Sequence, residues 1–177
     1  LQVSHLLPRN GRAEGERCID IVETARDRSV DVTFDMHTRL YGTTYLHVVV
    51  PPWALEGGAE ALAARLADGQ TRARMKKFES ILSVGKNWRR VVLFDNARWP
   101  EYARQSIADI AEARGQEPLD AAYDLLLGVS ERTQELKVIL HCYTDDEQRA
   151  VFSHPRCMPG SDATTMATDG PFAGEFF

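Results

Sequence analysis

Short apolar segments of strand character alternate along this chain with amphipathic helical segments, and this alternation restricts the fold more than any other feature. Apolar residues recur with helical spacing between successive strands. Such an order is typical of an α/β protein with a parallel sheet, which we therefore expect here. The predicted strands are Gln2 to Leu6, Val30 to Phe34, Arg90 to Phe94, Lys137 to Cys142 and Arg156 to Met158.

Capping and stop residues indicate where the helices begin and end. Ser106 is a favourable N-cap for a helix that Gly115 ends, and Gly128 stops the next helix. A long connection, residues 38–57, opens a region, residues 38–100, that we interpret as a loop and helical insertion after the second strand. The predicted helices are Glu14 to Arg28, Ala59 to Leu66, Thr71 to Leu82, Ser106 to Arg114, Leu119 to Leu127 and Asp145 to Ser153.

Composition argues against several classes of partner. The net charge of -5 disfavours nucleic acid, which requires a basic surface. Basic residues do cluster between Arg72 and Arg90, and we interpret them as a solvated helix face. Because no apolar run approaches the length of about 18 residues that a membrane-spanning helix needs, we expect no membrane partner. The three cysteines form no CxxC pair, which indicates a reducing compartment, and we expect a cytoplasmic protein.

Both ends of the sequence look internal to a longer chain. An apolar strand begins almost at Leu1, and the sequence stops on the apolar pair Phe176-Phe177. Natural termini are usually more polar than this. We therefore expect residues 1–177 to form a single partial domain of a longer protein.

Histidine and carboxylate side chains stand where predicted strands end. His5 closes the first strand, His37 follows the second, His141 falls at the end of the fourth and Asp162 follows the last. The C-terminal ends of parallel strands meet at one edge, and imidazole and carboxylate are ligands of Zn²⁺. This pattern predicts a metal centre with His5, His37 and Asp162 as ligands. Asp162 is also the candidate catalytic base, since a carboxylate beside a metal can accept a proton from activated water.

Each candidate also has an ordinary structural interpretation. A lone strand histidine is more often packed and hydrogen-bonded than ligating, and the Pro-Gly-Ser-Asp segment, residues 159–162, is common turn chemistry. His141 could be the second histidine ligand in place of His37, or a substrate contact, although a packed strand-end residue is its more common interpretation. We interpret His154 as structural and do not expect His47, in the covering loop, to be a ligand. A carboxylate such as Asp35 could fix the tautomer of a neighbouring imidazole.

Several short motifs follow one another in a defined order. They are Ser4-His5, the strand with Asp35 followed by Gly42-Thr43-Thr44, Trp53 before Gly57-Gly58, and His154-Pro155 followed by Gly160-Ser161-Asp162. This ordered set resembles the N-acyl-D-amino-acid deacylase (D-aminoacylase) group of the metal-dependent amidohydrolase superfamily. The similarity covers nearly the whole chain.

The resemblance implies a (β/α)8 TIM barrel, of which this chain would supply about the fifth to eighth strands with their helices. It implies zinc-dependent hydrolysis of the amide bond of N-acyl-D-amino acids, with the remainder of the barrel as a partner. His5 would match the metal histidine of the fifth strand, His37 that of the sixth, and Asp162 the catalytic aspartate of the eighth. Arg39 and Tyr41, which follow the sixth strand, are candidate contacts for a substrate carboxylate.

Two departures separate the chain from this group. Residues 35–39 read Asp-Met-His-Thr-Arg where members commonly carry Asp-x-Tyr-Pro-Tyr, and the first-strand His-x-His and the metal-binding cysteine have no counterpart. With so few ligand candidates, we expect this chain alone to bind zinc weakly and to lack deacylase activity. Two alternatives stay open, namely a cyclic-amide hydrolase of the dihydroorotase or hydantoinase kind and a non-catalytic α/β binding module.

Overall fold

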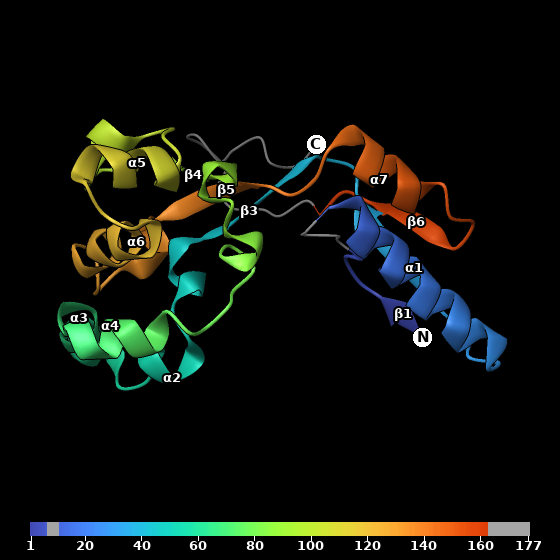
Figure 1. Ribbon diagram of the computed structural model, residues 1–177, viewed down its shortest axis with the longest axis horizontal. Helices are drawn as coiled ribbons and strands as arrows, with labels where there is room; N and C mark the ends of the chain where they lie inside the picture. The colour runs from blue at the N-terminus through green and yellow to red at the C-terminus, as the bar shows by residue number, and fades with distance from the viewer. Residues whose placement is uncertain (7–10, 163–177) are drawn as a thin grey trace. The chain divides into compact units, whose positions relative to one another are not determined.

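The computed structural model describes residues 1–6 and 11–162 (Figure 1). The expected fragment end at Phe176-Phe177 lies outside these residues. The chain divides into two compact units, the first formed by Leu1–Tyr41 with the residues from Cys142 onward, and the second by Gly42–His141. The second unit overlaps the insertion expected at residues 38–100 and continues to His141.

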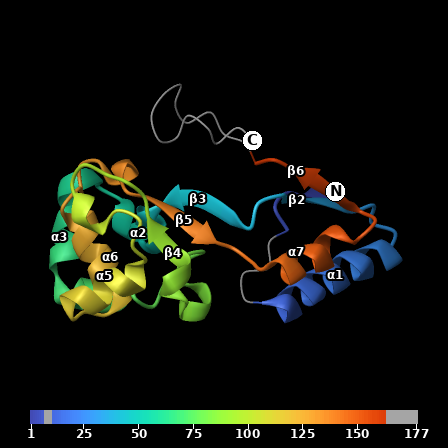
Figure 2. The same cartoon turned by 90° about the horizontal axis from the view of Figure 1, so that it is seen from above.

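The first unit is built on a three-stranded parallel sheet in the order β1-β2-β6. Its strands are β1 (Gln2–Val3), β2 (Thr33–His37) and β6 (Cys157–Gly160), and Phe34 lies opposite Cys157 in the register. Helix α1 (Arg12–Asp27) joins β1 to β2, and α7 (Asp145–Phe152) precedes β6. The two helices lie side by side on one face of the sheet (Figure 2).

The two faces of this sheet differ in chemistry. Phe34 and Met36 are fully buried, whereas Thr33 and Asp35 between them are partly exposed. Successive strand residues point to opposite faces, so the buried pair belongs to the face that the helices cover. The open face carries Thr33 and Asp35, together with the exposed Met158, which lies opposite Asp35 in the register.

The expected α/β class is confirmed, but the described strands do not close into a barrel. The predicted strands near Arg90 and Lys137 exist, as β4 (Val91–Leu93) and β5 (Lys137–His141). Our expectation that they extend the parallel sheet is wrong, because they pair antiparallel with each other in a second sheet, ordered β3-β5-β4. Its third strand, β3 (Tyr41–Tyr45), falls in the segment that we interpreted as a connection. Strand propensity marks an extended segment but does not name its partner.

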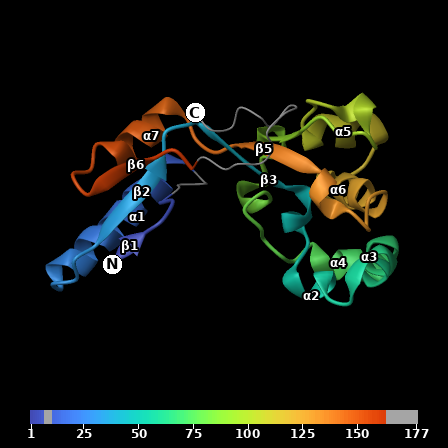
Figure 3. The ribbon, with the colours of Figure 1, turned by 180° about the vertical axis from the view of Figure 1, so that it is seen from behind.

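Helices α3, α5 and α6 cover the hydrophobic core of the second unit, with α6 beside both others (Figures 1 and 3). The helices are α2 (Pro52–Leu55), α3 (Gly58–Ala67), α4 (Gly69–Met75), α5 (Ile107–Arg114) and α6 (Pro118–Leu127). The 3₁₀ turns are η1 (Leu46–Val49), η2 (Val84–Lys86), η3 (Trp88–Arg90), η4 (Pro100–Tyr102) and η5 (Thr133–Glu135).

Caps decide several helix boundaries. The Ser106 hydroxyl accepts a hydrogen bond from the Asp109 backbone N–H at 3.1 Å, and Gly115 ends α5 at φ 61°, as predicted. Helix α4 instead ends at Met75, well before the predicted Leu82. The buried hydroxyl of Ser83 accepts from the Ser80 backbone N–H at 2.7 Å, and this local bond offers the backbone a turn in place of the helix.

Within residues 1–6 and 11–162, the model contains no helix that combines the length and the apolarity needed to cross a membrane.

Candidate active site at the ends of the parallel strands

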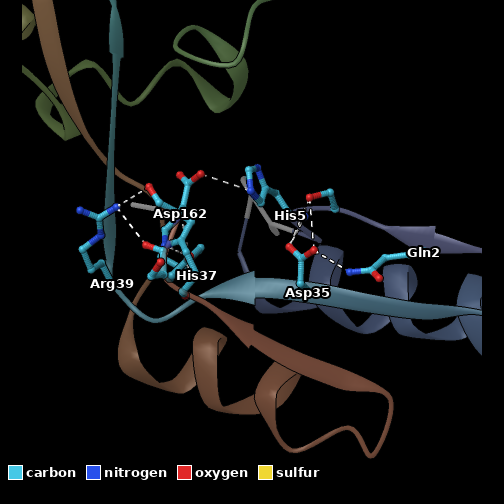
Figure 4. A network of polar contacts seen from close by, with 9 residues as sticks. Gln2, His5, Asp35, His37, Arg39 and Asp162 are labelled. Atoms are coloured by element: carbon cyan, nitrogen blue, oxygen red, sulfur yellow. Dashed lines mark hydrogen bonds and ion pairs between the residues drawn. The ribbon is translucent and has the colours of Figure 1, made fainter. Parts of the chain in front are cut away.

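Three of the predicted site residues lie at one edge of the parallel sheet, where β1, β2 and β6 end (Figure 4). His5 follows β1, His37 is the last residue of β2, and Asp162 follows β6. The His5 Nε2 lies 3.3 Å from the Asp162 Oδ1, and the two side chains are 46% and 40% exposed. The pair is thus accessible to a small molecule.

Both members of this pair hold an unusual backbone conformation. The φ angle is 56° at His5 and 49° at Asp162, in the left-handed region that side chains with a Cβ rarely adopt. Such a conformation costs about 1–3 kcal/mol and persists where surrounding contacts enforce it. Two such residues face each other beyond the ends of the two strands that flank β2, which makes the pair a candidate site.

Asp35 enforces the conformation at His5. Its carboxylate accepts hydrogen bonds from the His5 backbone N–H at 2.8 Å, the Gln2 side-chain amide at 2.9 Å and the Ser4 hydroxyl at 3.2 Å. Its backbone carbonyl accepts from the Leu6 N–H at 2.9 Å. Asp35 therefore holds both N–H groups that flank the His5 side chain. These hydrogen bonds join Asp35 to the backbone of His5 rather than to an imidazole ring, so its role differs from the tautomer control that we considered.

Arg39 holds Asp162 from the other side. Its Nη2 donates to the backbone carbonyls of Ser161 and Asp162, each at 3.2 Å. The guanidinium carbon also lies 5.9 Å from the centre of the Tyr41 ring, and Tyr41 is exposed. The Nε of Arg39 is buried and has no acceptor among the described residues. Asp35 in β2 and Arg39 in the loop after β2 thus hold the segments that follow β1 and β6.

His37 is buried, with only 2% of its surface exposed. The Tyr143 hydroxyl lies 2.9 Å from its Nδ1 and 3.1 Å from its Nε2, and the Gln148 side chain donates to its backbone carbonyl at 3.2 Å. Tyr143, itself buried, precedes α7. His37 therefore lies in the cluster, but its ring contacts a tyrosine instead of the His5–Asp162 pair.

The electrostatics of the cluster follow from burial and hydrogen bonding. Burial lowers the pKa of His37, because it disfavours the charged imidazolium, while a hydrogen bond with the Arg39 backbone and the charge of Asp162 act against this shift. The backbone N–H of His5 lowers the pKa of Asp35, as do the bonds from Gln2 and Ser4. His37 is thus favoured as a neutral imidazole and Asp35 as a carboxylate.

The residues present do not by themselves fit a zinc ion. A zinc site takes three or four ligands in fixed geometry. In the part of the chain that the structure describes, no three His, Cys, Asp or Glu side chains meet as a metal-binding group. His5 and Asp162 converge, whereas both ring nitrogens of His37 face the Tyr143 hydroxyl.

The other histidines lie elsewhere. His141 ends β5 in the second unit and is exposed, so our interpretation of it as a packed residue is wrong. His47, in η1, stacks on the Tyr45 ring with centres 5.4 Å apart. The His154 Nε2 lies 2.9 Å from a Glu23 carboxylate oxygen, and so links the end of α7 to α1. The contact with Glu23 agrees with the structural interpretation of His154.

Sequence reasoning missed Tyr143, Gln2 and Ser4 as members of the cluster. Gln2 and Ser4 are two residues apart, so their side chains point to the same side of the chain before His5. This alternation of polar residues was the signal that could have indicated them. Tyr143 carried no such signal, since it reaches His37 across more than a hundred residues of sequence.

Solved structures resemble this chain in fold. One D-aminoacylase structure, concerned with the role of a binuclear metal centre, matches 91% of this chain and 25% of its own chain at 18% identity and a TM-score of 0.53. Another D-aminoacylase structure, said to define a subset of amidohydrolases, matches the same shares at 18% identity and a TM-score of 0.52. An N-acyl-D-glutamate deacylase from Bordetella bronchiseptica, with zinc and a phosphonate inhibitor, matches 91% of this chain and 26% of its own at 21% identity and a TM-score of 0.48.

No protein-family model matches the chain, and no curated protein matches it. The chain spans about a quarter of the length of the structures that it resembles. Their low identity makes this a likeness of fold. The resemblance to D-aminoacylase is thus confirmed at that level, and the chain has the α/β fold of one part of a D-aminoacylase chain.

Proposed function

We propose that this chain is part of a zinc-dependent amidohydrolase that cleaves the amide bond of N-acyl-D-amino acids. The observation that carries the proposal is the His5–Asp162 pair, with both residues held in the left-handed region by Asp35 and Arg39. The likeness to the D-aminoacylase fold supports the choice of reaction. We place the missing metal ligands in parts of the protein beyond this chain.

In this proposal Asp162 moves the proton. Its carboxylate takes a proton from the water that attacks the acyl carbon and delivers it to the leaving nitrogen as the carbon–nitrogen bond breaks. The products are a carboxylic acid and a free amino acid, so no other reactant is required. His5 and His37 would help to hold the zinc ion together with ligands from elsewhere in the protein, and His37 would then have to give up its contact with Tyr143.

Arg39 and Tyr41 are the proposed contacts for the substrate carboxylate. The buried Nε of Arg39 has no acceptor among the described residues, and a buried guanidinium N–H gains from an anionic partner. Tyr41 lies beside the guanidinium and is exposed, so it can border the same ligand.

The test uses the longest natural chain that contains these residues, with N-acetyl-D-methionine as substrate. Loss of a positioned general acid–base should lower kcat by about 10²- to 10⁴-fold in Asp162→Asn. The matched control is Asp20→Asn, on the exposed surface of α1, which should leave kcat unchanged. Unchanged turnover in Asp162→Asn would contradict the proposal.

Two further measurements separate the alternatives. His5→Ala should lower the zinc content of the purified protein, whereas a binding module with packed histidines would show no zinc to lose. Faster turnover of dihydroorotate or a hydantoin than of the linear amide would favour a cyclic-amide hydrolase and overturn the substrate assignment.

A further inference from the structure

The basic cluster between Arg72 and Arg90 is not the uniform solvated helix face that we expected. Three of its side chains form ion pairs at 2.6 Å, and a fourth stacks on an aromatic ring. The pairs are Arg72 with Asp124, Lys76 with Asp120 and Arg89 with Asp109, and Arg74 lies over the Trp53 ring. Among the described residues, Lys77 and Lys86 have no carboxylate partner within ion-pairing distance.

Lys77 and Lys86 line the same cavity of the second unit. Its volume is about 510 Å³, within the range of about 300–1,000 Å³ that small-molecule sites occupy. Phe78, Trp88 and Leu119 supply apolar wall. Lys76 also lines the cavity but is paired with Asp120, so Lys77 and Lys86 are the two lysines in its described lining without such a pair that adjoin this aromatic and aliphatic surface, which is large enough for a bicyclic ring.

The backbone around this cavity is shaped to present Lys86. Gly85 and Lys86 are consecutive residues with φ of 70° and 53°, and Asn87 separates them from the buried Trp88. A lysine in the left-handed region is unfavourable, and such positions gather at ligand sites. The hydrogen-bonded turn of Ser80 and Ser83 precedes this kink.

The other charges at the cavity narrow the choice of ligand. Glu79 and Glu117 also line it, so a polyphosphate or another polyanion would meet two carboxylates. A single anionic group can face the two lysines without that penalty, and an apolar body can cover the aromatic wall. A ligand with one charge and one flat apolar part matches both halves of the lining.

We propose that this cavity binds a small organic monoanion with a flat apolar body, with its anionic group on Lys77 and Lys86 and its body against Phe78 and Trp88. The site is separate from the proposed catalytic pair, because every residue that forms it belongs to the second unit. Its existence therefore does not depend on the proposed amidohydrolase function.

The test uses 2-naphthoate as the probe and the full chain in amide-resolved NMR. We expect saturable shifts centred on Lys77, Lys86 and Trp88 in the unaltered protein. The double variant Lys77→Gln with Lys86→Gln should weaken binding at least about tenfold, whereas the double variant Arg17→Gln with Arg28→Gln, an equal charge change at exposed positions of the first unit, should not. The uncharged analogue 2-naphthamide should bind at least about tenfold more weakly than 2-naphthoate.

Three outcomes would overturn the proposal. The first is no saturable binding, or shifts centred away from the cavity. The second is equal affinity in the lysine double variant and the Arg17→Gln with Arg28→Gln control. The third is displacement of 2-naphthoate by inorganic phosphate at equal affinity, which would remove the apolar part of the assignment. The mapping on the unaltered protein keeps the test decisive even if the double variant folds poorly.

Discussion

Removal of the Asp35 carboxylate should loosen the segment after β1 that carries His5. In Asp35→Ala the backbone N–H of His5 and the side chains of Gln2 and Ser4 lose their shared acceptor. A hydrogen bond to a charged group contributes about 1.5–3 kcal/mol when buried. Because Asp35 is partly exposed, water replaces much of this, and we expect the local stability of the first unit to fall by about 1–2 kcal/mol.

Hydrogen exchange at the amides of His5 and Leu6 measures this effect directly. A loss of about 1–2 kcal/mol corresponds to exchange that is about 5- to 30-fold faster. Asp31→Ala is the matched control, since Asp31 is 86% exposed and contacts Arg156 only at 3.8 Å. Tryptophan fluorescence provides a second control, since Trp53, Trp88 and Trp99 all belong to the second unit, whose unfolding should not change.

The pH dependence follows from the lowered pKa of Asp35. A carboxylate with a lowered folded-state pKa stabilises the protein above its unfolded value, 3.8, and this contribution is lost as the pH falls through the folded-state pKa. The difference between the wild type and Asp35→Ala should therefore be complete near neutral pH and shrink in acid. Equal exchange rates in the wild type and Asp35→Ala at neutral pH would refute the role assigned to Asp35. So would an equal loss of stability in the second unit, as reported by the tryptophan transition.

Two predictions concern the second unit, and urea unfolding monitored by tryptophan fluorescence tests both. In Gly128→Ala the new Cβ would lie 2.5 Å from the ring of Trp99, so we expect the free energy of unfolding to fall by about 1–3 kcal/mol. In the control Gly69→Ala the new Cβ meets nothing within 4 Å, and this variant should be neutral or slightly stabilised. Equal effects of the two substitutions would contradict the packing argument. The buried Tyr123 hydroxyl has no partner among the described residues, and burial raises its pKa to about 12, so Tyr123→Phe should not destabilise the protein. Since the unfolded tyrosine ionises near pH 10, the wild type should lose about 1.4 kcal/mol per pH unit relative to Tyr123→Phe between pH 10 and 12, and a constant difference would contradict this.

The sequence alone was sufficient for features that depend on neighbours in the chain. Ser106 and Gly115 bound α5 as expected, because a cap acts on amides and carbonyls within one helical turn. The run from Lys137 is a strand, since its β-branched and apolar residues favour extended backbone. The positions of His5, His37 and Asp162 at strand ends could likewise be predicted, because parallel strands linked by helices end at one edge.

Only the tertiary structure decided which strands pair and which distant side chains contact each other. Val91–Leu93 pairs antiparallel with Val138–Leu140 because both segments bury apolar side chains in the core of the second unit, and no local signal encodes that choice. The same holds for Arg39 on the Asp162 carbonyl and Tyr143 on His37, which join residues more than a hundred positions apart. Propensity and capping energies act over a few residues, whereas contacts of this kind exist only once the core has brought distant segments together.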